Sequence, residues 1–184
     1  MAPARIAIIC GLLLGVAGPS LSADDPNERL DVLLSDLASA SADDAPAIES
    51  RIQEIWADAP SDTVDVLYER AEIAAALGRA EDAAALLDHI LILSPDFAQG
   101  WAERARHRLR EDDFSGALSD LQRALDIEPR HFTALADLGG AFLALGNEDA
   151  ALEAFREAVA INPHLEDAQA AIDRLKRDVE GQGI

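Results

Sequence analysis

The chain of 184 residues contains a single cysteine, Cys10, and it falls inside an apolar N-terminal segment. Residues 1–5 carry positive charge, residues 6–18 are apolar, and small residues follow up to Ala23. This order is typical of a secretory signal peptide, and the apolar stretch is too short for a stable membrane span. The sequence therefore predicts a signal peptide over residues 1–23, cleaved after Ala23 or one residue earlier.

Cleavage there would leave a mature chain without cysteine, which excludes disulfide bonds, thiolate metal sites and thiol nucleophiles. A lipid anchor on Cys10 is disfavoured, because Ile9 stands where a small residue is needed and too little apolar sequence comes before it. An exported protein that folds without disulfides fits the bacterial periplasm, and the sequence predicts that location.

Basic residues are scarce, since 15 Lys and Arg stand against 35 Asp and Glu. Removal of residues 1–23 takes away Arg5 and no acid, so 14 bases and 35 acids give the mature chain a formal charge of −21. Such a charge repels nucleic acid. It either attracts a basic partner or cations, or it keeps a long helical surface soluble. The wide scatter of the acids favours the second interpretation.

Residue patterns for covalent chemistry are also missing from the sequence. No glycine-flanked serine turn, phosphate loop or cofactor fingerprint occurs. The four histidines are not spaced as metal ligands. Carboxylates are numerous, but close pairs on a helical surface usually face solvent. We therefore predict no catalytic residue, no metal site and no cofactor, and a protein that is not an enzyme.

The sequence does contain a period of 34 residues, repeated without a gap over residues 64–97, 98–131 and 132–165. Positions 8 and 20 of each unit are small and position 24 is bulky, which lets two antiparallel helices approach to about 8–10 Å. Position 32 is a helix-ending proline. In unit order, these residues are Ala71, Ala105 and Gly139 at position 8, Ala83, Ala117 and Ala151 at position 20, Leu87, Leu121 and Phe155 at position 24, and Pro95, Pro129 and Pro163 at position 32.

This pattern resembles the tetratricopeptide repeat (TPR) family at nearly every signature position. The resemblance implies an all-α fold, an α-solenoid of helix-turn-helix repeats with one repeat in each of the three units. Within the repeats, Gly78 and Gly146 follow apolar helix ends and suit left-handed C-terminal caps. The middle repeat has Arg110 and Glu111 in this region, which predicts a looser or differently closed turn.

Two further segments show apolar residues at helical spacing. Residues 24–61 predict a helical hairpin, which we interpret as a degenerate repeat that caps the array because the small signature residues are missing. Residues 166–180 carry an apolar stripe that includes Ala168, Ile172 and Leu175. They predict a helix that covers the exposed end of the last repeat, as solenoids require.

The resemblance also implies a binding surface on the concave face, lined by positions 2, 5, 6, 9, 12 and 13 of each first helix. Arg106 and Arg110 at its centre would grip a carboxylate or main-chain oxygens, beside an acidic end, and Gly140 would leave room for close approach. Carried onto this sequence, the predicted partner-binding residues are Asp65, Tyr68, Glu69 and Glu72 in the first repeat, Gln99, Glu103, Arg106, Leu109 and Arg110 in the second, and Thr133, Asp137, Gly140 and Leu143 in the third.

The charge of these positions restricts the partner. TPR proteins that clamp acidic C-terminal tails use Lys, Asn and Arg where this chain has Tyr68, Glu72, Glu103 and Asp137. That mode is excluded by charge, and the groove is expected to take a peptide or helix with basic and apolar groups. The alternative is that Tyr68, Arg106 and Arg110 only pair with neighbouring acids.

The run over residues 128–146 and the leucine-rich N-terminal hairpin are similar to short exported TPR proteins of alphaproteobacteria that are linked to cell-envelope integrity. The resemblance implies a scaffold with a protein or peptide partner, no nucleic acid, and no stable membrane insertion after signal cleavage. Apolar surface left at either end would support a homodimer. Two rival functions remain: an assembly factor or chaperone for an exported system such as cytochrome maturation or pilus export, and a cell-wall hydrolase.

Overall fold

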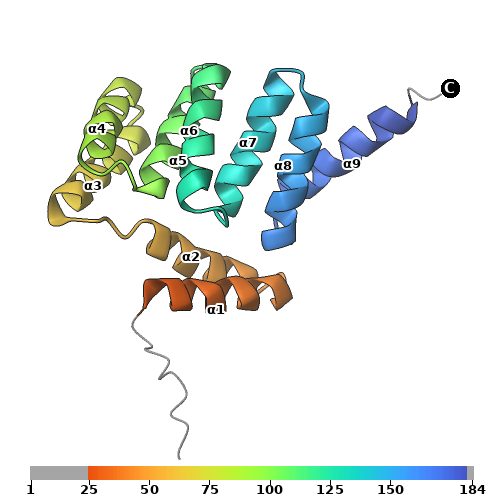
Figure 1. Cartoon of the computed structure of the whole chain (residues 1–184), viewed down its shortest axis with the longest axis horizontal. Coiled ribbons are helices and arrows are strands. Elements are labelled where there is room, and N and C mark those ends of the chain that lie inside the picture. Colours follow the sequence, from red (N-terminus) through yellow and green to blue (C-terminus); the bar gives the residue numbers. More distant parts are fainter. Residues whose placement is uncertain (1–24, 182–184) are drawn as a thin grey trace, which may run out of the picture.

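The computed structural model describes residues 25–181, and that part of the chain is made of helices without strands (Figure 1). The predicted all-α fold is therefore confirmed. The predicted signal peptide and its cleavage site lie outside the described residues. The helices are α1 (Pro26–Ser39), α2 (Ala45–Trp56), α3 (Asp62–Ala76), α4 (Ala80–Leu93), α5 (Ala98–Arg110), α6 (Phe114–Ile127), α7 (Phe132–Ala144), α8 (Glu148–Ile161) and α9 (Glu166–Gly181).

The three sequence units form three helical hairpins, α3/α4, α5/α6 and α7/α8, which stand side by side in a row (Figure 1). The second helix of each hairpin packs on the first helix of the next, and α8 packs in the same way on α9. Ala168, Ile172 and Leu175 of α9 are buried against this end of the row. No helix in the described part of the chain is long and apolar enough to cross a membrane.

Small side chains set the spacing within each hairpin. Ala83, Ala117 and Ala151 are fully buried where the paired helices meet. At Gly139 the contact is so close that an added Cβ would lie 2.7 Å from the ring of Phe155 on the partner helix. The sequence signature therefore acts through steric fit between neighbouring helices.

The turns inside the three hairpins are closed in the same way. Gly78 and Gly146 adopt left-handed conformations with φ of 70° and 77°, as expected, and in the middle repeat Asp112 takes this place with φ of 58°. The expectation of a looser middle turn at Arg110 and Glu111 is wrong. Asp112 donates its backbone N–H three residues back and the next residue donates five residues back, as at both glycines. A short Asp tolerates the left-handed region better than most residues.

Polar side chains begin most of the repeat helices. Ser61 caps α3, Asp113 caps α6 and Asn147 caps α8, each by accepting a hydrogen bond from a backbone N–H in the first turn. At α7 the cap is His131, whose ring nitrogen Nδ1 accepts from the N–H of Ala134. The short turns therefore satisfy donors that the helix starts would otherwise leave open.

The N-terminal hairpin α1/α2 does not cap the row, and this prediction of its position is wrong. It runs beneath the row and crosses the lower ends of the repeat helices (Figure 1). Its apolar face forms one cluster with Phe132 at the start of α7, packed against Ile161 and Leu165 at the end of the last repeat. The buried members of this cluster from α1 and α2 are Leu30, Leu33, Leu37, Ala45, Ile52 and Trp56.

Polar contacts fix the hairpin to the two connections that follow α6 and α8. Glu49 of α2 accepts a hydrogen bond from Nδ2 of Asn162 at 2.7 Å, and Nε2 of His164 lies 3.2 Å from the carbonyl oxygen of Leu37. The indole of Trp56 stacks on the His131 ring with centroids 4.1 Å apart. The hairpin thus ties the second and third repeats together at one end.

Candidate functional site

A groove of about 660 Å³ opens on the inner side of the row between α5, α7 and α9. The hairpin forms one border through Glu49 of α2. Its floor is apolar and its walls are mostly acidic, with two arginines among them. The lining residues are Glu49, Arg106, Thr133, Ala136, Asp137, Leu143, Phe155, His164, Leu165, Glu166, Asp167, Ala168, Ala171 and Arg174.

Arg106 on α5 is held in place by two carboxylates. Its Nη1 donates to Glu103 at 2.6 Å, and its Nε donates to Asp137 of α7 at 3.4 Å. Partial burial raises the pKa of Asp137, and the charge of Arg106 offsets part of that increase. Arg106 therefore joins neighbouring repeats, and only part of its hydrogen-bonding capacity is left for a partner.

A chain of hydrogen bonds continues from this ion pair to His131, on which Trp56 of the hairpin stacks. The amide nitrogen of Gln99 donates to Tyr68 at 3.2 Å and to Glu103 at 3.0 Å. The amide oxygen of Gln99 lies 2.9 Å from Nε2 of His131. Because Nδ1 of His131 accepts from a backbone N–H, Nε2 carries the proton and donates to Gln99. The side chains of Gln99 and His131 are therefore matched with partners, whereas the buried Nε1 of Trp56, which stacks on His131, has none among the described residues.

His131 is neutral in this setting. It has no exposed surface, and burial, helped by the charge of Arg106, lowers its pKa to about 4. A proton on Nδ1 would oppose the backbone N–H that this nitrogen accepts. The ring therefore serves as a cap, a hydrogen-bond donor and a stacking surface for Trp56.

The structure brings only some of the predicted partner-binding residues into the groove. Arg106, Thr133, Asp137 and Leu143 line it. Tyr68 and Gln99 are buried and used in internal contacts, while Glu103 and Leu109 are half-buried. The remaining predicted residues are exposed outside the groove, and they are Asp65, Glu69, Glu72, Arg110 and Gly140.

Two further features of the inner side bear on the expected partner. The pKa of Glu72 is raised, first by partial burial and then by the charges of Glu103 and Glu69, which places three carboxylates near one another. Gly140 has open space where a side chain would stand, as expected. The surface beside the groove is therefore acidic around Glu72, and at Gly140 it leaves space for the backbone of a partner.

The pairing alternative raised by the sequence is correct for one of its three residues. Arg106 pairs with neighbouring acids, whereas Tyr68 bonds to the amide of Gln99 and Arg110 forms no ion pair with a described residue. The two arginines of the predicted binding centre therefore differ. Arg106 is held by two carboxylates, and Arg110 is exposed.

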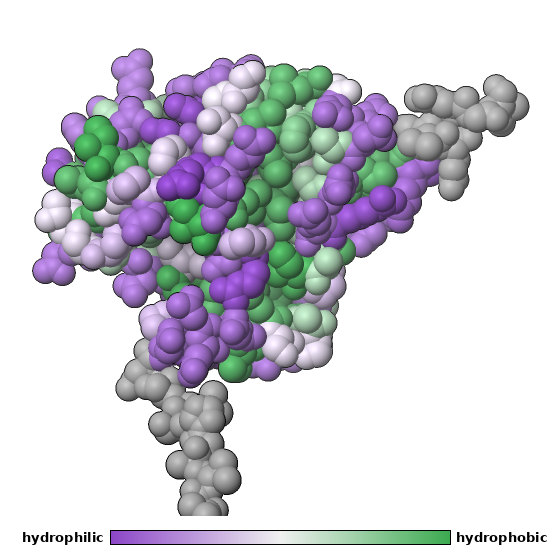
Figure 2. Space-filling model, viewed as in Figure 1, coloured by the Kyte–Doolittle hydropathy of each residue, from purple (hydrophilic) through white to green (hydrophobic). Residues whose placement is uncertain are grey.

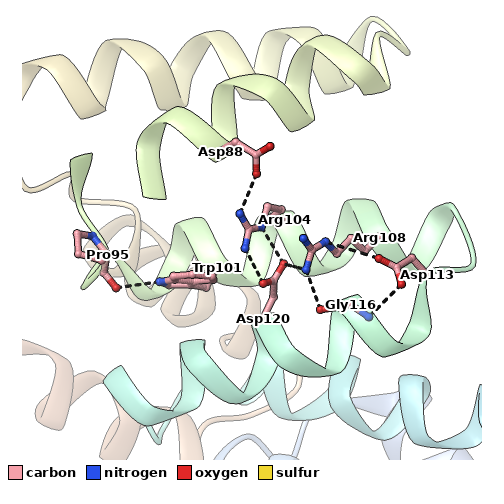
Figure 3. Close-up of polar contacts among 8 residues, drawn as sticks. All are labelled: Asp88, Pro95, Trp101, Arg104, Arg108, Asp113, Gly116 and Asp120. Atoms are coloured by element: carbon pink, nitrogen blue, oxygen red, sulfur yellow. Dashed lines mark hydrogen bonds and ion pairs between the residues drawn. The ribbon is translucent and has the colours of Figure 1, made fainter. Parts of the chain in front are cut away.

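An ionic cluster that sequence reasoning missed lies between α4, α5 and α6 (Figure 3). Asp120 of α6 is only 2% exposed. Its carboxylate accepts hydrogen bonds from Arg104 at 2.7 and 2.9 Å and forms an ion pair with Arg108 at 2.9 Å. Arg104 also reaches Asp88 on α4 at 2.8 Å and lies over the ring of Trp101. The cluster fixes α5 relative to both neighbours.

A signal for this cluster exists in the sequence. Asp120 falls three residues after Ala117 and directly before Leu121, so it shares the helix face that carries the core positions 20 and 24. A carboxylate on that stripe needs cationic partners, because an unpaired buried charge is costly. In the described residues no group of three or more His, Cys, Asp or Glu is arranged to hold a metal ion.

Known structures share this architecture. The chain is similar to the first TPR domain of Spaghetti (RPAP3) bound to the HSP90 peptide SRMEEVD, with a TM-score of 0.63 and 19% identity over 66% of this chain and 97% of that one. It is also similar to the Yersinia enterocolitica type III secretion chaperone SycD in complex with a peptide of the translocator YopD, with a TM-score of 0.61 and 15% identity over 64% and 95%. At these identities the likeness shows the fold, a helical-repeat solenoid.

Sequence comparison is more specific. The family model for the tetratricopeptide repeat matches residues 40–96 and 103–166. A TPR repeat-containing protein of Rhizobium etli is 31% identical over 161 residues, which cover 87% of this chain and 79% of that protein. The chain belongs to the tetratricopeptide repeat family. The fold of this family is typical of protein-interaction scaffolds, some of which bind peptides.

Proposed function

We propose that this protein is a periplasmic scaffold that binds a basic, partly apolar peptide segment of a partner protein in the groove between α5, α7 and α9. The observation that carries the proposal is the combination of an apolar floor with acidic walls. Ala136, Leu143 and Leu165 give the floor, and Glu166 and Asp167 stand at its border. Side chains of Lys or Arg in a bound peptide would meet these carboxylates while its apolar groups cover the floor.

The charge of the groove separates this proposal from recognition of acidic tails. The peptide bound by the Spaghetti domain, SRMEEVD, contains three acidic residues and one basic residue. The same kind of ligand would face Asp137, Glu166 and Asp167 here, and Arg106 already pairs with Asp137 and with Glu103. An acidic peptide would therefore be repelled.

A peptide titration tests the groove. A synthetic peptide with alternating Lys and Leu residues is titrated into the mature protein by calorimetry, and its isomer with Glu in place of Lys serves as the comparison. We expect binding of the basic peptide, and a loss of roughly fivefold or more in the Glu166→Gln/Asp167→Asn double variant. The matched control is Glu153→Gln/Glu157→Gln, which removes the same charge from exposed positions of α8 outside the groove. Equal losses in the two variants, or a preference for the acidic peptide, would refute the groove.

The cellular part of the proposal, export to the periplasm and support of envelope integrity, is supported by the sequence of residues 1–23 and by the resemblance to exported TPR proteins. The N-terminus of the protein recovered from an osmotic-shock fraction should begin at Asp24 or one residue earlier. A gene deletion should increase sensitivity to detergent. A full-length protein found only in the cytoplasm would contradict the location.

A further inference from the structure

The outer face of α3 carries apolar side chains that the other two repeats bury at the same register. Position 3 is Gly100 in α5 and Ala134 in α7, and both are buried, whereas Val66 of α3 is 53% exposed. Position 10 is buried as His107 and Ala141, whereas Ile73 is 48% exposed. In Figure 2 apolar residues reach the surface over this end of the row, among hydrophilic neighbours.

The contacts in the next repeat show what normally covers this face. A Cβ added at Gly100 would meet Leu91 and Ile90 of α4, so position 3 faces the second helix of the preceding hairpin. Arg104, at position 7, reaches across to Asp88 on that same helix. Positions 3 and 7 of a first helix therefore lie on the surface on which a preceding helix packs, and position 10 shares that helix face because it follows position 7 by three residues.

Within residues 25–181 no such helix covers α3. The hairpin α1/α2, which precedes it in sequence, is held beneath the row by the cluster around Trp56 and Phe132. A groove of about 510 Å³ remains open along α3 and α4, lined by residues that include Arg70, Ile73, Leu86 and His89. The opposite end of the row is closed by α9, whereas the described residues leave the α3/α4 end uncovered.

Arg70 indicates which charge a helix that covers this face of α3 would carry. It stands at position 7, the register of Arg104, and it forms no ion pair with any described residue. Arg104 binds a carboxylate at position 25 of the covering helix, which is Asp88. By analogy with Arg104, the guanidinium of Arg70 in the middle of this apolar stripe would pair with a carboxylate of the helix that packs there.

We infer that the exposed face of α3 is a second docking surface, which takes an amphipathic helix of a partner protein with a carboxylate opposite Arg70 and small residues opposite Val66. Small residues are required because Val66 is larger than Gly100 and Ala134 at the same register, so a bulky partner residue would force the helices apart. This surface is separate from the groove between α5, α7 and α9, and the inference does not depend on the proposed function.

The probe is a peptide of residues 114–128, the α6 helix that packs on α7, restrained as a helix by a lactam bridge. It already has Ala124 at position 27, and Gln122→Glu places a carboxylate at position 25. A second peptide carries Gln122→Arg at the same position. Both are titrated into the mature full chain, with Val66 and Ile73 methyl signals followed by NMR.

We expect the Glu peptide to bind wild-type protein about fivefold more tightly than the Arg peptide, with shifts at Val66 and Ile73. In the Arg70→Glu variant this order should reverse. Arg123→Glu, an exposed charge reversal on α6, is the matched control and should leave the order unchanged. Binding of the Lys and Leu peptide in the other groove should be the same in all three proteins, so failure at one surface is distinguishable from failure at the other.

Three outcomes would overturn the inference. The first is the absence of binding with unchanged Val66 and Ile73 signals. The second is a preference for the Glu peptide that persists in Arg70→Glu. The third is self-association of the mature protein in sedimentation that Ile73→Glu abolishes, because the face would then be occupied by a second copy of this chain.

Discussion

Ala117 illustrates how single side chains fix the geometry of a repeat. It is fully buried in the cluster shared by α5, α6 and α7. We expect Ala117→Leu to lower the free energy of unfolding by roughly 1–3 kcal/mol, because the added atoms must displace packed neighbours. Urea denaturation measures the loss. Ala160→Leu on the exposed side of α8 is the control and should change stability by less than about 0.5 kcal/mol. Similar losses at both positions would contradict the packing.

Asp112 is the one residue other than glycine with a positive φ among the described residues. Its φ of 58° matches those of Gly78 and Gly146 in the equivalent turns. We expect Asp112→Gly to stabilise the protein by about 0.5 kcal/mol, because glycine adopts this conformation without steric cost. Gly78→Ala should destabilise it by about 1 kcal/mol. Thermal denaturation of each variant measures these changes. A lower melting temperature for Asp112→Gly than for the unmodified protein would contradict a steric cost of the positive φ at Asp112.

His131 makes stability depend on pH. The folded protein holds its pKa at about 4, below the usual 6.5, so the unfolded chain takes up a proton at higher pH than the folded one. Stability from this residue is therefore complete above pH 6.5 and is lost as the pH falls from 6.5 to 4, by about 3 kcal/mol in all.

Urea denaturation at several pH values measures this loss. The variant His131→Gln cannot titrate at this site, so its stability should fall less steeply between pH 6.5 and 4. The same slope in both proteins would exclude His131 as the cause.

The helices α4, α5 and α6 are held together through Asp120. Its carboxylate is almost fully buried and meets both Arg104 and Arg108. We expect Asp120→Ala to cost about 3–5 kcal/mol in unfolding free energy, because two guanidinium groups lose their common partner. Asp88→Ala removes an acid that is 59% exposed from the same cluster and should cost under about 1 kcal/mol. Chemical denaturation of both variants tests the difference, and equal costs would contradict it.

The repeated elements could be predicted from the sequence because their determinants are local. Small residues at positions 8 and 20, proline at position 32 and glycine after a helix end each act within one hairpin. The position of the α1/α2 hairpin could not be predicted in this way. Leu30, Leu37 and Ile52 show that its helices are amphipathic, but the same pattern would suit either the end of the row or the surface beneath it.

The candidate site was predictable only in part. The concave-face register found Arg106, Thr133, Asp137 and Leu143, because these positions follow from the first helices alone. Glu49 and the residues of α9 line the groove because segments far apart in the sequence pack together, which the repeat register does not predict. The burial of Tyr68 and Gln99 likewise depends on contacts with another helix, which no repeat register contains.

The charge of the whole molecule should govern partner binding. The formal charge of −20 would add a long-range attraction for basic peptides to the proposed contacts in the groove. Raising the ionic strength from about 0.05 to 0.5 M shortens the screening length to a few ångströms and should weaken binding of the Lys and Leu peptide on the order of tenfold. Calorimetry at several salt concentrations measures the trend. An affinity that does not change with salt would mean that apolar contacts alone hold the peptide.

The hairpin α1/α2 beneath the row should change how the molecule folds. Repeat arrays usually gain stability from neighbours along the chain and fray from their ends. Here Glu49 bonds to Asn162, 113 positions away, and His164 meets Leu37, 127 positions away. These bonds close a loop that spans most of the chain, which raises the contact order and slows folding. Terminal fraying would have to break that closure first, so unfolding should approach a single cooperative step.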